Sequence, residues 1–415
     1  MLRIGGSLAH APGTDPRRAS DRKVLDRFDR AFFPMQTLTT LEKLVLTVAL
    51  AAATVTSWAA PAIPRSEIER KPMRLLAVFE GGAAIELEAL LVKPAAEARY
   101  PLALITHGSP RQSEARRRMS AAQMSFQAEE LARRGYVAVV VMRRGYGTSE
   151  GSWDESSGRC DSADHERAAR ESARDLRAAL RALASHPQVD ATRTIVIGQS
   201  AGGIGTLALA ADPPPGLKAV VNFAGGRGSR APNEICREDR LIEAYAAFGK
   251  AARVPSLWIY TENDHYFGPE LARRMFAAYR EKGGVGELRL LPAFGEDGHA
   301  LFARRGGVPQ WRPLLDAFLR KNDLPTWDSP PTEPSVAQLP APEVLATEYL
   351  QQWHRYLESS DNKAFAISPT GRFAWRSGRY TPAAARTAAL DACGLQSCRL
   401  YSQNDTLVSE TLVSR

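Results

Sequence analysis

A ten-residue stretch at positions 194–203 constrains the fold of this chain more than any other segment. It reads Thr-Ile-Val-Ile-Gly-Gln-Ser-Ala-Gly-Gly, so a β-branched run typical of a buried strand leads directly into a Gly-x-Ser-x-Gly turn. Residues 204–211 are small and apolar, which predicts a helix after the turn. A strand, a tight turn and a helix display the serine at the tip of the turn, and small residues are needed beside it. We therefore predict that Ser200 is a nucleophile.

Strands and helices alternate on both sides of this stretch. The patterns predict a hairpin formed by residues 73–79 and 84–91. Further strands are predicted at 101–106, 136–142, 217–223, 254–260 and 287–291. Helices are predicted between and after these strands, at 119–134, 163–183, 269–282 and 310–320. A mostly helical insert is expected at 227–250. This alternation predicts an α/β fold with a mainly parallel sheet and helices on both faces. Ligands of such sheets bind beyond the carboxyl ends of the strands.

A serine hydroxyl is a weak nucleophile until a base takes its proton. Among the seven histidines, His299 lies in a glycine-bounded loop after the last predicted strand, where the base belongs in the order Ser, Asp, His. His265 is the alternative, but it lies beside the predicted acid, which could not easily orient it. His107 ends a strand, where a structural role is expected. The base is therefore assigned to His299.

The imidazole needs a carboxylate that fixes its tautomer and stabilises its charge. Asp264 follows a predicted strand and is the expected acid. Glu262 is one alternative. Asp297 is another, but only one residue separates it from His299, which makes a side-on approach to the ring awkward.

The oxyanion of a tetrahedral intermediate needs backbone N–H donors. We expect one from Ala201, which follows the nucleophile, and one from Ser109 in the loop His-Gly-Ser-Pro after the strand 101–106. Arg227 could receive a substrate carboxylate or pair with an acidic side chain on the surface. The candidate pocket residues, for whose aromatic members core packing is an open alternative, are Trp153, Arg227, Tyr266, Phe267 and Phe302.

Five motifs together resemble the α/β-hydrolase superfamily, and within it the dienelactone-hydrolase-like and prolyl-oligopeptidase-like serine hydrolases. They are His107-Gly108-Ser109-Pro110, Arg144-Gly145-Tyr146-Gly147-Thr148-Ser149, Gly198-Gln199-Ser200-Ala201-Gly202, Asp264 and His299. The resemblance covers roughly residues 70–322 and implies an eight-stranded, mostly parallel sheet with esterase or peptidase chemistry and no cofactor. Dienelactone hydrolases use a cysteine nucleophile, whereas this chain has Ser200, so their substrate is not carried over.

The first 60 residues have the character of a leader. A polar, basic segment precedes an apolar stretch at 44–60, and small residues at Ser57 and Ala59 fit signal-peptidase cleavage after Ala59. A retained membrane anchor is the alternative, and translation could begin at Met1 or Met35. We expect an exported protein, periplasmic or secreted, that meets the membrane only through an uncleaved signal.

Export makes the four cysteines interpretable as disulfides. The favoured pairs are Cys160–Cys236, which would pin a short lid over the site, and Cys393–Cys398 near the C-terminus. The sequence contains neither a Cys-x-x-Cys motif nor a close pair of histidines, so no such motif indicates a metal site. The net charge of +8 is spread along the chain without a basic block interleaved with aromatics, so nucleic-acid binding is not expected.

The domain boundaries follow from composition. A leader and signal peptide (1–60) precede a catalytic domain (61–324). Six prolines mark a linker at 325–342, and a small α+β domain follows at 343–415. A domain this small has little core, so a disulfide staple is expected. Its partner is not evident, although it resembles small cysteine-stapled domains of exported bacterial proteins.

These observations predict an exported serine hydrolase that cleaves a carboxylic ester or related acyl bond through an acyl-enzyme. A serine peptidase acting on short peptides is the alternative, although too few residues precede the first strand to hold a β-propeller. A third hypothesis, of another class, is a non-catalytic cell-envelope binding protein built on a hydrolase scaffold.

Overall fold

The computed structural model describes residues 59–79, 81–82 and 84–408, all within one compact unit, Ser57–Arg415. The predicted leader falls outside these residues except for Ala59 and Ala60, between which the predicted cleavage lies. Ala59 and Ala60 form a short strand, β1 (Ala59–Ala60), that pairs in parallel with β12 (Thr326–Trp327). Among the described residues, no helix is both long enough and apolar enough to cross a bilayer.

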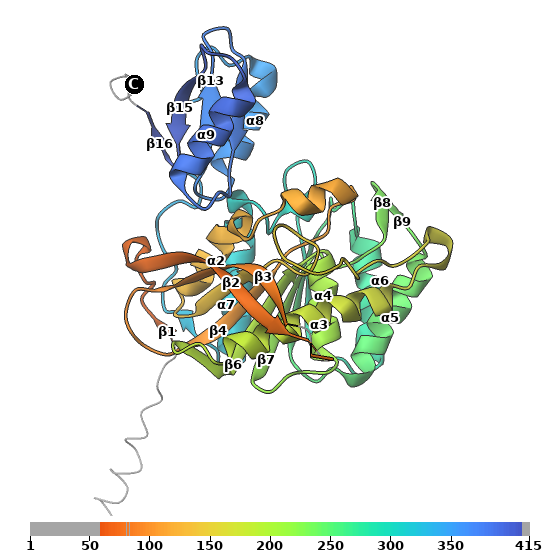
Figure 1. Ribbon diagram of the computed structural model, residues 1–415. Helices are drawn as coiled ribbons and strands as arrows, with labels where there is room; N and C mark the ends of the chain where they lie inside the picture. Colours follow the sequence, from red (N-terminus) through yellow and green to blue (C-terminus); the bar gives the residue numbers. More distant parts are fainter. Residues whose placement is uncertain (1–58, 80, 83, 409–415) are drawn as a thin grey trace, which may run out of the picture. The chain divides into compact units, whose positions relative to one another are not determined.

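The larger part of the described chain is built on an eight-stranded sheet with the order β11-β10-β7-β6-β4-β5-β3-β2 (Figure 1). Neighbouring strands from β11 to β5 run parallel, whereas β3 and β2 are antiparallel. The predicted fold class is confirmed. The strands are β2 (Ile68–Val78), β3 (Ala84–Pro94), β4 (Tyr100–Thr106), β5 (Val137–Val141), β6 (Val189–Gln199), β7 (Leu217–Phe223), β10 (Ser256–Thr261) and β11 (Gly286–Leu291).

Helices cover both faces of the sheet because side chains alternate along its central strands. Leu104 and Val196 point into one buried cluster, and Ile105 and Ile197 point into the other. The first cluster is closed by α3 (His165–Leu183), α4 (Ala201–Ala210), α5 (Glu238–Ala251) and α6 (Pro269–Glu281), and the second by α2 (Ser125–Ala132) and α7 (Val308–Lys321). Two buried hydrophobic cores therefore hold the sheet in place beneath the loops that follow its strands.

Two predicted segments differ in detail. The expected helix at 119–134 begins as a 3-10 turn, η3 (Ala121–Met124), capped by Ser120 and Gln123, before α2 starts. The insert predicted as mostly helical contains a small hairpin, β8 (Ser229–Ala231) and β9 (Glu234–Ile235), before α5. The remaining short turns are η1 (Arg65–Glu67), η2 (Ser113–Arg118), η4 (Cys160–Ser162), η5 (Gly298–Ala300), η6 (Arg305–Gly307) and η7 (Thr347–Tyr349).

The C-terminal residues form a sheet of their own, with the order β14-β13-β15-β16. Thr381 caps the helix α9, because its side-chain oxygen accepts from the backbone N–H of Ala384, and Pro382 opens the first turn of the helix. The Cys393–Cys398 disulfide is present, which confirms that pairing, and both cysteines lie in the buried cluster. The elements are α8 (Leu350–Leu357), β13 (Ala364–Ile367), β14 (Phe373–Arg376), α9 (Pro382–Cys393), β15 (Arg399–Gln403) and β16 (Thr406–Leu407).

Candidate active site

Ser200 occupies the turn between β6 and α4. Its backbone has φ 55° and ψ −120°, a conformation that non-glycine residues rarely adopt and that recurs at functional sites. The turn is tight enough that a Cβ on Gly198 would lie 2.3 Å from the carbonyl oxygen of Gly202. The first amides of α4 have no partner within the helix and carry its positive dipole end. The turn thus directs the Ser200 side chain to the same end of the sheet as these donors.

His299 and Asp264 meet in the loops beyond β11 and β10. The ring Nδ1 of His299 lies 3.0 Å from Oδ2 of Asp264, which is buried. Burial raises the pKa of Asp264, but the charge of His299 and hydrogen bonds from His299, Phe267 and Tyr266 outweigh it and lower the pKa. A carboxylate that stays ionised holds the proton on Nδ1 and leaves Nε2 as the basic nitrogen.

Neighbouring groups fix the position of the His299 loop. Asp297 accepts hydrogen bonds from the backbone N–H of His299 (3.0 Å) and of His265 (3.1 Å), so it shapes the loop rather than contacting the ring. The side-chain amide of Gln199 donates to the carbonyl of His299 at 2.9 Å, which ties this loop to the residue before Ser200. Among the described residues, no hydrogen bond joins the Ser200 hydroxyl to His299, and such bonds often tighten only when substrate binds.

The predicted oxyanion loop lies against the serine. A Cβ on Gly108 would lie 2.9 Å from the Cβ of Ser200, so only glycine allows this approach. Ser109, Ser200 and Ala201 line the same cleft. The ring of His107 is buried and bonded to backbone, with Nε2 accepting from the N–H of Arg143 at 3.1 Å, as its expected structural role requires. Burial lowers its pKa well below the usual value, with the charge of Arg143 adding to that effect.

A buried polar network that we did not predict supports this loop. Glu155 accepts from Arg143 (3.2 Å) and from Arg227 (2.8 Å). Burial raises the pKa of Glu155, but the two guanidinium groups outweigh it and hold the pKa far below its usual range. Tyr146 links the network to the cleft, because its hydroxyl lies 3.0 Å from Glu155 and 2.9 Å from the hydroxyl of Ser109. Tyr146 belongs to a motif quoted from the sequence, whereas nothing local marked Glu155.

The cleft above Ser200 has a volume of ≈ 350 Å³. Four of the five predicted pocket residues line it: Trp153, Arg227, Tyr266 and Phe267. Phe302 does not line it, because its ring is buried in the core and stacks on that of Phe223 with centroids 4.0 Å apart. Of the two roles considered for Arg227, the structure shows pairing with an acidic side chain, but in the interior rather than on the surface. No cluster of three or more His, Cys, Asp or Glu side chains suited to a metal occurs in the described part of the chain.

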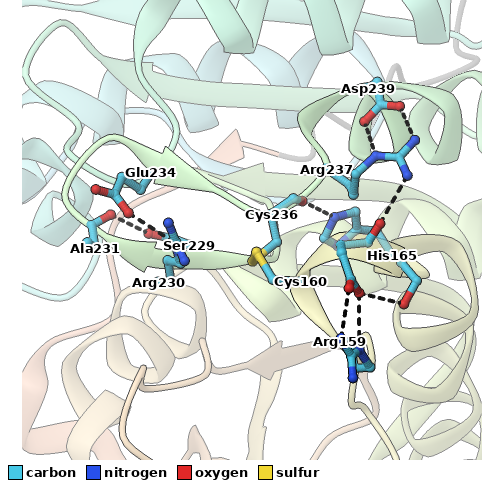
Figure 2. Close-up of a disulfide and its surroundings, with 12 residues drawn as sticks. Arg159, Cys160, His165, Ser229, Arg230, Ala231, Glu234, Cys236, Arg237 and Asp239 are labelled. Carbon is cyan, nitrogen blue, oxygen red and sulfur yellow. Dashed lines mark hydrogen bonds and ion pairs between the residues drawn. A yellow bond between two sulfur atoms is a disulfide. The ribbon is translucent and has the colours of Figure 1, made fainter.

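The Cys160–Cys236 disulfide closes one wall of the cleft and confirms the predicted pairing. Figure 2 shows the bond beside His165, whose Nε2 lies 2.7 Å from the carbonyl oxygen of Cys236. Burial lowers the pKa of His165, so the neutral ring donates from Nε2 to that carbonyl. The segment carrying β8 and β9 is thus fixed at Cys236 both covalently and by a hydrogen bond.

Loss of the Cys160–Cys236 bond is expected to destabilise the protein by about 2–4 kcal/mol. The reason is that this bond closes a long loop in the unfolded chain and so lowers the entropy of the unfolded state. The sequence separation is 76 residues, against 5 for Cys393–Cys398. Urea unfolding of the Cys160→Ala/Cys236→Ala variant measures the loss, and the matched Cys393→Ala/Cys398→Ala variant should lose less. Equal losses would contradict the loop-length argument.

Comparison with known proteins finds a family match and similar solved structures. Residues 81–283 match the family model of the X-Pro dipeptidyl-peptidase (S15 family). This match and the strand order of the sheet agree with an α/β-hydrolase fold. No curated protein matches it. Similar solved structures include an esterase from Pyrococcus furiosus (15% identity, TM-score 0.44, covering 63% of this chain and 94% of that one). An acylaminoacyl peptidase from Pyrococcus horikoshii is similar at 19% identity and TM-score 0.45, covering 64% of this chain and 43% of that one.

Proposed function

We propose that this α/β-hydrolase is a serine hydrolase that cleaves a carboxylic ester or related acyl bond. The observation that carries the proposal is the Asp264–His299 pair held beside the strained turn of Ser200. In this mechanism His299 takes the proton of Ser200 as the hydroxyl attacks the carbonyl carbon, and it then returns the proton to the leaving group. Asp264 orients the ring, and the amides of Ser109 and Ala201 bind the oxyanion. Water attacks the acyl-enzyme by the same route in reverse.

A peptidase is the second candidate, because the matching family is named for an X-Pro dipeptidyl-peptidase. An enzyme that removes N-terminal dipeptides must hold a protonated amine, for which a carboxylate is the natural partner. Among the described residues that line the cleft, Glu155 carries the only carboxylate, and it is already paired with Arg143 and Arg227. This charge distribution favours an ester over a peptide with a free N-terminus.

Export of the protein remains part of the proposal. Both disulfides are of the kind that persists in oxidising compartments. The apolar stretch at 44–60 and the small residues before Ala60 are consistent with a cleaved signal. The mature N-terminus of protein recovered from the periplasm or medium would test this, with cleavage after Ala59 expected.

Labelling with a fluorophosphonate probe tests the catalytic role of Ser200. The probe forms a covalent bond only with an activated serine, so we expect the wild type to be labelled and Ser200→Ala to remain unlabelled. Ser157→Ala is the matched control, because Ser157 lines the same cleft. An unlabelled wild type, or labelling that survives in Ser200→Ala, would rule the proposal out. Paired acyl esters and peptide amides then separate esterase from peptidase activity.

A further inference from the structure

Two arginines project over aromatic walls of the cleft. The guanidinium carbon of Arg111 lies 3.6 Å from the ring centroid of Tyr266, and that of Arg116 lies 3.8 Å from the ring centroid of Trp153. Both belong to the segment that follows the oxyanion loop, Arg111 two residues after Ser109 and Arg116 in η2. A guanidinium stacked by its face keeps its N–H donors at the edge, free to bind an anion.

The two walls are held in place by His299 and by the polar network beside the cleft. The ring of Tyr266 stacks on His299, with centroids 4.0 Å apart and an interplanar angle of 15°. The indole N–H of Trp153 donates to the hydroxyl of Tyr146 at 3.0 Å. Arg111 also donates to the hydroxyl of Ser229 at 2.8 Å, which further restricts it. Both charges are thus positioned before any ligand arrives, which lowers the entropy cost of binding.

The charges that line the cleft do not balance. Its arginines are Arg111, Arg116, Arg227 and Arg230, and its single carboxylate is Glu155. Arg227 is paired with Glu155, and Arg230 is paired with Glu234 at 3.0 Å (Figure 2). Within the described part of the chain, neither Arg111 nor Arg116 forms an ion pair with a carboxylate. An acidic neighbour of Arg116 is the exposed Glu114, whose pKa is lowered by a hydrogen bond from Ser113 and, to a smaller extent, by the charge of Arg116. A cleft with two cations that are outside any ion pair attracts anions.

We propose that Arg111 and Arg116 form a subsite for an anionic group of the substrate, so that the enzyme prefers esters that carry a carboxylate. This inference rests on the proposed hydrolase function and names its substrate class. The guanidinium groups bind the carboxylate through charge-assisted hydrogen bonds at the cleft wall, while the ester carbonyl lies at Ser200.

Matched substrates test the preference. One pair, 3-acetoxybenzoate and 3-acetoxybenzamide, places the charge on the leaving group, and a second pair, monophenyl glutarate and its carboxamide, places it on the acyl group. We expect kcat/KM to be about tenfold or more higher for the carboxylate of at least one pair, mainly through a lower KM. Added salt should reduce the difference, because it screens charges near the surface.

Charge-removing variants locate the subsite. Arg111→Gln and Arg116→Gln should each remove most of the preference, measured as a fall in the ratio of kcat/KM for the carboxylate ester to kcat/KM for its carboxamide. Arg118→Gln is the control, because Arg118 is exposed in the same η2 turn, does not line the cleft and changes net charge equally. Equal rates for both members of each pair, or an equal effect of Arg118→Gln, would overturn the inference.

A binding measurement separates failure of this inference from failure of the proposed function. Isothermal titration of the Ser200→Ala protein with benzoate and with benzamide requires no catalysis. We expect benzoate to bind more tightly, and Arg111→Gln in the same background to abolish the difference. Equal binding of the two ligands would refute the subsite even if wild-type enzyme hydrolyses esters. Tighter benzoate binding by a protein that no fluorophosphonate labels would uphold the subsite while refuting the hydrolase.

Discussion

Replacement of His299 by alanine should lower kcat for ester hydrolysis by about 10⁶-fold, and Asp264→Asn should lower it by about 10⁴-fold. The smaller effect has a specific cause. Oδ1 of Asp264 accepts from the backbone N–H of Tyr266 (2.7 Å) and of Phe267 (2.9 Å), and Oδ2 faces Nδ1 of His299. An asparagine that keeps the two backbone bonds turns its NH₂ toward Nδ1. The proton then moves to Nε2, which can no longer act as the base.

Steady-state kinetics with 4-nitrophenyl acetate measure both effects, and circular dichroism reports whether each variant is folded. The double variant should be no slower than His299→Ala alone, because the two residues act as one unit. His265→Ala is the control, since His265 neighbours Asp264 in sequence but makes no side-chain contact with it among the described bonds. A larger loss in His265→Ala than in His299→Ala would reverse the assignment of the base.

The parts of the site that were predictable are those with a local sequence signature. Gly-x-Ser-x-Gly after a β-branched run indicates the turn of Ser200, because steric demand fixes the residue types at each position. Asp264 and His299 were found from their place after successive strands, and parallel strands bring their carboxyl ends to one edge. The contact between them, with Nδ1 3.0 Å from Oδ2, agrees with that reasoning, and their catalytic roles remain predictions.

The parts that were not predictable depend on contacts across long sequence separations. Glu155 lies in a polar loop where an exposed carboxylate would be the ordinary expectation, and its partner Arg227 is 72 residues away. Arg111 likewise stands in a basic, hydrophilic segment, and only the folded chain brings it over Tyr266. Neither side chain has a spacing or periodicity that distinguishes it from a charge exposed to solvent. The sequence alone therefore identifies neither the buried network of Glu155 nor the arginines over the aromatic walls of the cleft.

Replacement of Glu155 by methionine should lower the free energy of unfolding by about 3–5 kcal/mol, because it leaves Arg143 and Arg227 buried without a counter-charge. The midpoint of thermal unfolding should fall by about 10 °C. Arg227→Met should cost less, because Glu155 then still neutralises Arg143. The order of these two losses distinguishes a charge balance from simple packing, which predicts similar effects for both side chains.

Urea unfolding of the two variants, with Glu166→Ala as the control, measures these effects. Glu166 pairs with Arg170 on the exposed side of α3, so its loss should cost only about 0.3–0.5 kcal/mol.

The stabilising effect of Glu155 should depend on pH. Burial raises the pKa of Glu155, but the two guanidinium groups outweigh burial, so the pKa in the folded protein lies below its unfolded value. Its contribution to stability is therefore present above the unfolded pKa and is lost as pH falls toward the folded one. The stability difference between wild type and Glu155→Met should accordingly shrink in acid. A difference that stays constant from neutral pH down to pH of about 3 would show that the carboxylate is not stabilised by these arginines.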